Sequence, residues 1–279
     1  MSACLKSLFA RKKPYPDNIV DWRMVPKNEV TSSPKDPVLA QRRYYTETAS
    51  RYDAMHAHEA VDDDAGMQIL LSVLRTLDVR SLLDVGAATG RGLPRLAEGL
   101  PNTLVCGVEP VEALVRQGIS SGVNQGLPLL LASGDALPFA DKSFDAVCEF
   151  GILHHVPDPA RVIQEMLRVT RHVVVISDTN RFGQGTLPLR IIKLLLYKLK
   201  LWNAFDFLRT RGKGYQVSDG DGVFYSYSVY DNYDQIRQWA ESVDLFSTGE
   251  SCSSNWFRPL LTSGNVLLIA VRKKQVSAG

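Results

Sequence analysis

The feature that most constrains this chain is an alternation of short apolar runs with longer amphipathic stretches, which begins at Ser81. Such runs, bounded by turn residues, are typical of buried strands, and the stretches between them have the period of helices. The predicted strands cover residues 81–85, 103–108, 127–132, 144–150 and 172–177. The helices between them cover residues 91–99, 112–121 and 159–169. This alternation predicts an α/β fold in which helices cover both faces of a parallel sheet, joined by right-handed crossovers.

The pattern is less regular on either side of this core. Residues 1–36 hold prolines among polar side chains and show no clear period, so we expect an extended or disordered leader there. Further helices are expected at 38–55, 65–77 and 229–243, and a final strand at 265–272. We therefore predict one folded domain over residues 37–279, with an insertion at about 180–228.

Composition limits the class of protein and its location. The chain has 279 residues, 45% of them hydrophobic, which is enough to form a core without disulfides or metals. Its four cysteines are scattered, with no CxxC pair and no Cys/His cluster. We therefore predict no metal site and a reducing, cytoplasmic location. The N-terminus lacks the hydrophobic region of a secretory signal, and no apolar run approaches the ~18 residues that a membrane span needs.

Charge is spread unevenly along the chain. The formal net charge is only +2, but residues 1–14 and 187–214 are rich in Lys and Arg, so the remainder is acidic. A domain that binds nucleic acid would carry a broad basic surface. We therefore expect no nucleic-acid partner.

The first predicted strand leads into the segment DVGAATG, residues 84–90, which opens the next helix. Glycines here allow the backbone to pass close to a ligand, and ligands of open α/β sheets bind beyond the carboxyl ends of the strands. The GxxxG spacing differs from the GxGxxG of dinucleotide-binding proteins. Taken alone, the segment is equally consistent with an ordinary tight turn.

The next two strands each end in an acidic residue. Glu109 can accept hydrogen bonds from the two vicinal hydroxyls of a ribose, and Pro110 stops the strand so that the acid faces the crevice. Asp135 can accept a hydrogen bond from an adenine amino group, with Ala136 against the ring. Either acid alone could be a solvated residue at a strand end. Three successive strands that each end in a nucleoside contact favour a nucleoside site.

These segments together resemble the class I S-adenosylmethionine-dependent methyltransferases, especially the branch that acts on small molecules and quinones. The first motif of that family is a strand followed by DxGxGxG. The chain matches it at Asp84, Gly86 and Gly90 and has Ala88 in place of the middle glycine. The resemblance covers about residues 44–178 and includes the LHHV at 153–156. It implies a Rossmann-like three-layer α/β/α sandwich with a mostly parallel seven-stranded sheet and an antiparallel last strand.

The resemblance also implies S-adenosylmethionine as the cofactor. The residues that it assigns to the cofactor site are Asp84, Gly86, Ala87, Gly90, Glu109, Pro110, Asp135, Ala136, Phe150, Tyr45 and Tyr52. The two tyrosines would roof the cofactor, although core packing explains them equally well. His154 or His155 would be the general base that deprotonates the acceptor, the alternative being a structural role in the following turn.

Residues 187–202 predict a cationic amphipathic helix in the insertion. Its basic arc holds Arg190, Lys193, Lys198 and Lys200. Such a helix could contact a membrane surface, cover a hydrophobic acceptor, or pack over the sheet with its basic side in water. We expect a mobile loop at 212–222, and either an acceptor pocket or a plain strand in the aromatic segment 224–230.

Methyl transfer to an oxygen of a small organic or lipid-like acceptor is the function that these features favour. A non-catalytic S-adenosylmethionine-binding module and a nicotinamide-dependent oxidoreductase are the alternatives. The identity of the acceptor, the choice among oxygen, nitrogen and carbon, and the oligomeric state stay open.

Overall fold

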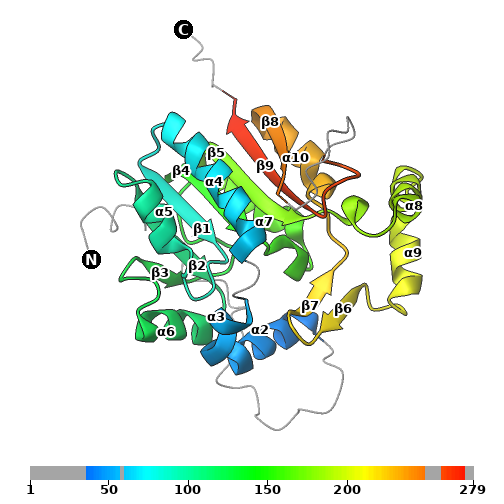
Figure 1. Cartoon of the computed structure of the whole chain (residues 1–279), viewed down its shortest axis with the longest axis horizontal. Helices are drawn as coiled ribbons and strands as arrows, with labels where there is room; N and C mark the ends of the chain where they lie inside the picture. Colours follow the sequence, from blue (N-terminus) through cyan, green and yellow to red (C-terminus); the bar gives the residue numbers. More distant parts are fainter. Residues whose placement is uncertain (1–35, 57–59, 249–258, 274–279) are drawn as a thin grey trace.

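The computed structural model describes residues 36–56, 60–248 and 259–273, which contain a seven-stranded sheet with helices on both faces (Figure 1). The strands of this sheet are β1 (Ser81–Val85), β2 (Leu104–Glu109), β3 (Leu129–Leu131), β4 (Phe144–Phe150), β5 (Thr170–Thr179), β8 (Ala240–Ser247) and β9 (Asn265–Arg272). Their order is β3-β2-β1-β4-β5-β9-β8. Neighbours from β3 to β5 are parallel, and β9 is antiparallel to both β5 and β8. The predicted Rossmann-like sandwich with an antiparallel last strand is confirmed.

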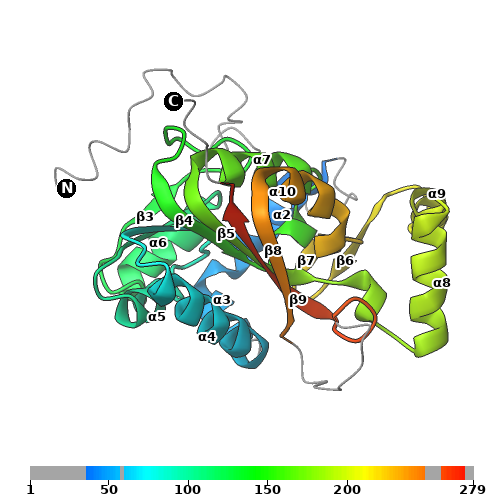
Figure 2. The ribbon, with the colours of Figure 1, turned by 90° about the horizontal axis from the view of Figure 1, so that it is seen from above.

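Two helical layers enclose the sheet, as the view from above shows (Figure 2). One layer contains α4 (Ala60–Thr76) and α5 (Leu93–Gly99), and the other contains α7 (Pro159–Val169) and α10 (Tyr233–Trp239). The side chains of β5 alternate between the two cores: Val174 packs with the α7 side, and Val173 and Val175 pack with the α4 side. In the described residues, no helix is long and apolar enough to cross a bilayer.

The boundaries of two predicted helices change. The predicted helix 38–55 is interrupted and becomes α2 (Pro37–Thr48), a 3-10 turn η2 (Ala49–Arg51) and α3 (Tyr52–Met55). The prediction of one helix over 229–243 is wrong beyond Trp239, because the chain enters β8 at Ala240 after a 3-10 turn η5 (Val229–Asn232) and α10. β8 is an edge strand that exposes alternate residues, and its charged outer face concealed the strand period.

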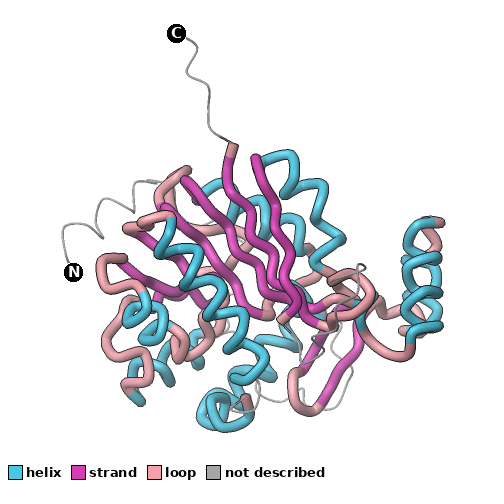
Figure 3. The backbone as a smooth tube through the Cα atoms, turned by 45° about the horizontal axis from the view of Figure 1, so that its top comes forward, coloured by secondary structure: helices cyan, strands magenta, loops and turns pink. Residues whose placement is uncertain are grey.

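The insertion also differs from expectation. The predicted helix 187–202 is two helices, α8 (Leu187–Lys198) and α9 (Trp202–Arg209), which lie outside the three layers (Figures 1 and 2). The prediction of a loop at 212–222 is wrong. Its residues enter the antiparallel hairpin of β6 (Tyr215–Ser218) and β7 (Gly222–Tyr225), which Figure 3 shows apart from the main sheet. The leader predicted at 1–36 lies almost wholly outside the described residues.

Candidate cofactor and acceptor site

The turn after β1 requires glycine at its first position. Gly86 has φ +79°, and a Cβ atom there would lie 2.4 Å from Cγ2 of Ile152. Gly90 also has a left-handed backbone, with φ +76°. Ala88 occupies the middle position with φ +50°, a conformation that disfavours any residue with a Cβ atom. The substitution of alanine in the family motif is therefore accommodated with backbone strain.

Glu109, at the end of β2, lies beside this turn, and hydrogen bonds fix its carboxylate. Oε2 accepts a hydrogen bond from the Ala88 backbone N–H (3.1 Å), and Oε1 accepts one from the Val111 N–H (2.9 Å). Burial raises the pKa of Glu109 to about 7, although these two hydrogen bonds favour the ionised form. Each oxygen retains a lone pair, so a ligand with two adjacent hydroxyls could still bind.

The two predicted roof tyrosines lie over the turn. Tyr45 and Tyr52 meet edge to face at 5.7 Å between ring centroids and pack against a small cluster that includes Ala88. A hydrogen bond joins this helical segment to the turn, because the Thr89 hydroxyl donates to Asp53 Oδ1 (2.6 Å). Arg91 lies over the Tyr52 ring, with 5.8 Å from its guanidinium carbon to the centroid. The α2–α3 segment therefore covers the turn where the cofactor is expected.

The structure places the remaining predicted cofactor residues in two groups. Asp84 and Ala87 are buried, and Pro110 and Phe150 are half-buried at the ends of β2 and β4. Asp135 is exposed beyond β3, with Ala136 half-buried beside it in the chain. The first group shares the carboxyl edge of the sheet with Glu109, whereas the carboxylate of Asp135 lies in solvent.

Two further carboxyl groups, which the sequence analysis missed, extend this acidic edge. Glu149 on β4 and Asp178 on β5 are buried, so four adjacent strands each contribute a buried acid near their carboxyl ends. Oε2 of Glu149 accepts from the Ile152 N–H (3.0 Å), whereas Oε1 has no hydrogen-bond partner among the described residues. Burial and the charge of Asp178 raise the pKa of Glu149 well above its usual value. This region favours a positively charged ligand.

Both predicted histidines lie on the 3-10 turn η3 (Leu153–His155), next to this edge. Nδ1 of His154 is 2.8 Å from Oδ1 of Asp178. Burial opposes protonation of His154, but the carboxylates of Asp178 and Asp221 outweigh it and raise the pKa of His154 to about 10. With no other ligand bound, His154 is therefore protonated at neutral pH and has no free lone pair.

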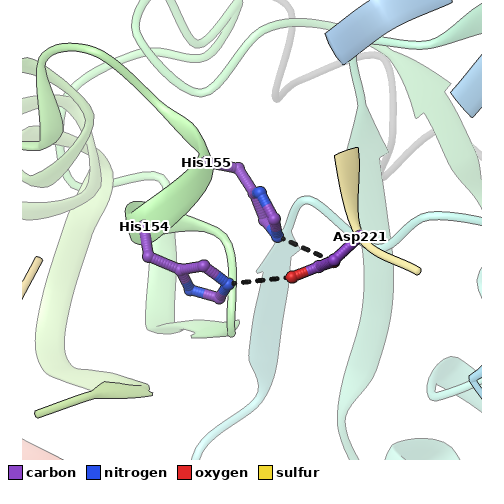
Figure 4. A group of neighbouring side chains, drawn as sticks. All are labelled: His154, His155 and Asp221. Carbon is purple, nitrogen blue, oxygen red and sulfur yellow. Dashed lines mark ion pairs between the residues drawn. The ribbon is translucent and has the colours of Figure 1, made fainter. Parts of the chain in front are cut away.

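His155 is held differently, through a backbone carbonyl. Its Nδ1 lies 2.7 Å from the Val223 carbonyl oxygen, so Nδ1 donates and Nε2 is directed elsewhere. Nε2 is 3.1 Å from Oδ1 of Asp221 and 3.5 Å from the Tyr45 hydroxyl. Figure 4 shows both imidazoles directed toward Asp221.

Asp221 belongs to the turn between β6 and β7, and Gln41 of α2 fixes that turn. The Gln41 side-chain amide donates to the Asp221 carbonyl (3.0 Å) and accepts from the Val223 N–H. Burial would raise the pKa of Asp221, but hydrogen bonds from His154 and His155 hold it below its usual value. No local sequence pattern indicates Asp221 or Gln41, since they meet only through tertiary contacts. Asp178 directly follows the predicted strand 172–177, so the rule that sites lie at carboxyl ends could have identified it.

A cleft of about 420 Å³ is lined by residues 156–160, directly after η3, and by residues 225–227 of the aromatic segment. Its lining includes Val156, Arg181, Tyr197, Trp202, Tyr225 and Tyr227. The buried Arg181 guanidinium pairs with Asp231 and lies over the Trp202 ring, 5.1 Å from its centroid. Burial lowers the pKa of Arg181 to about 10, so the guanidinium is still charged at neutral pH. The cleft combines apolar rings with one buried cation.

Comparison with known proteins places the central part of the chain in a family. Residues 83–175 match the family described as "Methyltransferase domain". A demethylmenaquinone methyltransferase of Roseiflexus castenholzii is 32% identical over 130 residues, which cover 46% of this chain and 55% of that protein. An uncharacterised methyltransferase of Mycobacterium sp. (strain KMS) is 41% identical over 92 residues, 33% of this chain and 35% of that protein. The chain thus spans from about a third to just over half of these relatives.

Solved structures agree on the fold. The magnesium protoporphyrin IX methyltransferase of Synechocystis PCC 6803 with bound SAH has a TM-score of 0.55 at 15% identity, covering 85% of this chain and 100% of that chain. A Burkholderia thailandensis 1,6-didemethyltoxoflavin-N1-methyltransferase has a TM-score of 0.54 at 16% identity, covering 88% and 94%. The matched domain, the strand order and the motif at residues 84–90 agree with one another. Residues 83–175 match a methyltransferase domain, and the sheet has the fold of solved methyltransferases.

Proposed function

We propose that this protein transfers a methyl group from S-adenosylmethionine to a small organic or lipid-like acceptor. The observation that carries the proposal is the buried Glu109 carboxylate, fixed beside the glycine turn at the end of β2. Its free lone pairs suit the two ribose hydroxyls of the cofactor. Ala136 and Asp135 are proposed to contact the adenine, and Tyr45 and Tyr52 to cover the nucleoside.

The acidic edge of the sheet supports a cationic cofactor. S-adenosylmethionine carries a sulfonium and an α-ammonium group, whose positive charges favour a site lined by carboxylates. Asp84, Glu149 and Phe150 lie toward the proposed methionine end. The unpaired Oε1 of Glu149 is an acceptor available to an ammonium group. NAD would place its negatively charged pyrophosphate here instead, which disfavours the oxidoreductase alternative.

The aromatic cleft is our candidate for the acceptor site. Its rings suit a flat or apolar molecule, and Arg181 could orient a carbonyl, hydroxyl or carboxylate on it. The names of the relatives fit this class, since demethylmenaquinone and protoporphyrin are apolar ring systems. The acceptor is not identified by these names.

We assign the general base to His155 rather than His154, and favour transfer to oxygen. His154 holds a proton that it releases only near pH 10. The Nδ1–H of His155 is fixed on the Val223 carbonyl, so the lone pair lies on Nε2 once this atom releases the proton that it donates to Asp221. An acceptor hydroxyl would lose its proton to Nε2 as its oxygen attacks the methyl carbon and the C–S bond breaks. S-adenosylhomocysteine and the methyl ether are the products.

A peripheral membrane contact through 187–202 is proposed as the route for a lipid-like acceptor. Two members of the predicted basic arc face the rest of the protein. Arg190 donates a hydrogen bond to the backbone carbonyl of Leu261, and Lys193 donates one to that of Arg181. The apolar face is consequently directed outward, with Leu195 56% exposed and Leu199 65% exposed. Lys198 and Lys200 flank this face and would meet anionic headgroups.

The proposed activity is tested by incubating the purified protein with methyl-labelled S-adenosylmethionine and fractionated lipid and small-molecule extracts. We expect label in an acceptor fraction and the formation of S-adenosylhomocysteine. Cofactor binding without transfer to any fraction would support the non-catalytic module. Binding of NAD in place of S-adenosylmethionine would support the oxidoreductase.

A further inference from the structure

The group formed by His154, His155 and Asp221 has a feature that an ordinary ion-pair cluster does not require. Each residue directs a metal-ligating atom toward the other two, and the three atoms lie within 4.8 Å of one another. The residues come from two distant segments, η3 and the β6–β7 turn, yet converge on one point (Figure 4). In a tetrahedral zinc site with bonds of about 2.0–2.1 Å, ligand atoms are separated by roughly 3.3 Å. Small side-chain shifts would bring the three atoms to that spacing.

The second nitrogen of each imidazole is also held as in a metal site. Nδ1 of His154 faces the fully buried carboxylate of Asp178 at 2.8 Å, and Nδ1 of His155 faces the Val223 carbonyl at 2.7 Å. Metal-ligating histidines almost always donate their other N–H to a carboxylate or a backbone carbonyl, which leaves the remaining nitrogen for the ion. Both histidines here have such a partner and direct Nε2 toward Asp221.

The supporting residues keep this arrangement rigid. Asp178 accepts two backbone hydrogen bonds, from Leu153 (2.8 Å) and Thr179 (2.5 Å), which fix the carboxylate behind His154. Gln41 bonds to the backbone on both sides of Gly222 and so fixes Asp221 opposite the histidines. The Tyr45 hydroxyl lies 3.5 Å from both His155 Nε2 and Asp221 Oδ1. The buried Asp178 and Gln41 therefore hold the three half-buried ligands in position.

We propose that His154, His155 and Asp221 form a site for a divalent transition-metal ion of the Zn²⁺ type. Two imidazoles and one carboxylate suit Zn²⁺, Co²⁺ or Fe²⁺, whereas Mg²⁺ and Ca²⁺ prefer oxygen ligands. Three protein ligands leave a coordination position open. This proposal departs from the sequence-based expectation of no metal, which considered the cysteine spacing.

One consequence of this site, which rests on the proposed methyltransferase function, concerns the acceptor. A hydroxyl at the open position would lose its proton more readily because the metal stabilises the oxyanion. The ion would also occupy the Nε2 lone pair of His155, so His155 would then act as a ligand and the proton would pass to solvent. Metal binding itself does not depend on this function.

The test is titration of the chelator-treated full-length protein with ZnCl₂ by calorimetry, and with CoCl₂ followed by visible absorption. We expect one equivalent of either ion to bind and MgCl₂ to give no signal. His155→Ala and Asp221→Asn should each lose at least about 100-fold in Zn²⁺ affinity, and Asp178→Asn roughly 10- to 100-fold. Asp219→Asn, on an exposed residue of the same turn, should bind as the wild type does.

Circular dichroism of each variant establishes that the fold is retained. Absence of Zn²⁺ and Co²⁺ binding in the wild type overturns the proposal. Wild-type affinity in both His155→Ala and Asp221→Asn also overturns it. Binding of S-adenosylhomocysteine measured on the same samples separates the two proposals. If the protein binds Zn²⁺ but not S-adenosylhomocysteine, only the proposed function is contradicted. If it binds S-adenosylhomocysteine but not Zn²⁺, only the metal site is contradicted.

Discussion

The proposed cofactor side and the proposed acceptor side of this site are built in opposite ways. On the cofactor side, the turn at 84–90 and Glu109 lie at the carboxyl ends of the adjacent strands β1 and β2, and backbone hydrogen bonds with close packing fix them. On the acceptor side, Gln41, His155 and Asp221 come from three distant segments and are joined by side-chain contacts. The cofactor side therefore depends on backbone conformation, and the acceptor side depends on contacts between segments that are distant in the sequence. Substitutions should therefore affect folding on one side and ligand contacts on the other.

The largest expected effect tests how closely the cofactor side is packed. A Cβ atom on Gly118 of α6 (Glu112–Ser121) would lie 1.9 Å from the carbonyl oxygen of Thr89. Gly118→Ala must displace the helix or the turn, and we expect it to destabilise the protein by at least ~3 kcal/mol in urea unfolding. Gly92→Ala is the control, because nothing lies within 4 Å of its added Cβ. Equal stability of both variants would show that the turn is not tightly packed.

A second prediction sharpens the comparison through Glu109. Its folded-state pKa of about 7 exceeds the ordinary value of 4.5, so protonation stabilises the fold. This contribution is complete below pH 4.5 and is lost as the pH rises through 7. Relative to Glu109→Gln, the wild type should lose about 2 kcal/mol of unfolding free energy between pH 5 and pH 8. A pH-independent difference between the wild type and Glu109→Gln would contradict the buried, ionisable state of Glu109.

The acceptor side should instead tolerate substitution without loss of stability. Leu195→Glu with Leu199→Glu places charges on the exposed face of α8, so the unfolding free energy should change little. Binding to vesicles that contain anionic lipid should weaken at least tenfold, about 1.4 kcal/mol, in a sedimentation assay. Ile119→Glu, at an exposed position of α6, is the matched control. Unchanged vesicle binding by the double variant would exclude this face as the membrane contact.

The smallest effect is expected at Ala88. Its φ of +50° favours glycine, so Ala88→Gly relieves strain in the folded state. The added flexibility of glycine in the unfolded chain opposes this gain. We expect a net change below about 1 kcal/mol in thermal unfolding, with the cofactor affinity unaltered. A destabilisation of several kcal/mol would show that the methyl group of Ala88 has a packing role.

The same contrast explains what could be predicted from the sequence. Strands β1 to β5 and β9 follow from apolar runs. The rule that ligands bind at the carboxyl ends of parallel strands predicted Glu109, whereas Glu149 and Asp178 were missed. The predicted helix 229–243 extends into the start of the edge strand β8, because the outer face of β8 is charged and its inner residues beyond Ala240 are only half-buried. Asp221 and Gln41 acquire their roles only when the hairpin meets α2, and no local pattern encodes that contact.

The hairpin illustrates the limit of local reasoning further. Its segment is rich in glycine and aspartate, which usually indicates a mobile loop. The pairing of β6 with β7 and the hydrogen bonds from the Gln41 side chain order this segment instead. The resemblance covers about residues 44–178 and the matched family region ends at residue 175, so neither includes the hairpin.

The most direct test of the account is a calorimetric titration of the protein with S-adenosylhomocysteine. We expect binding by the wild type and by Glu112→Ala, which alters an exposed ion pair on α6. Glu109→Ala should bind roughly 10- to 100-fold more weakly, about 1.4–2.7 kcal/mol, because the ribose hydroxyls lose their acceptor. Equal affinity in Glu109→Ala and the wild type, or binding of NAD but not of S-adenosylhomocysteine, would contradict the cofactor site proposed at the end of β2.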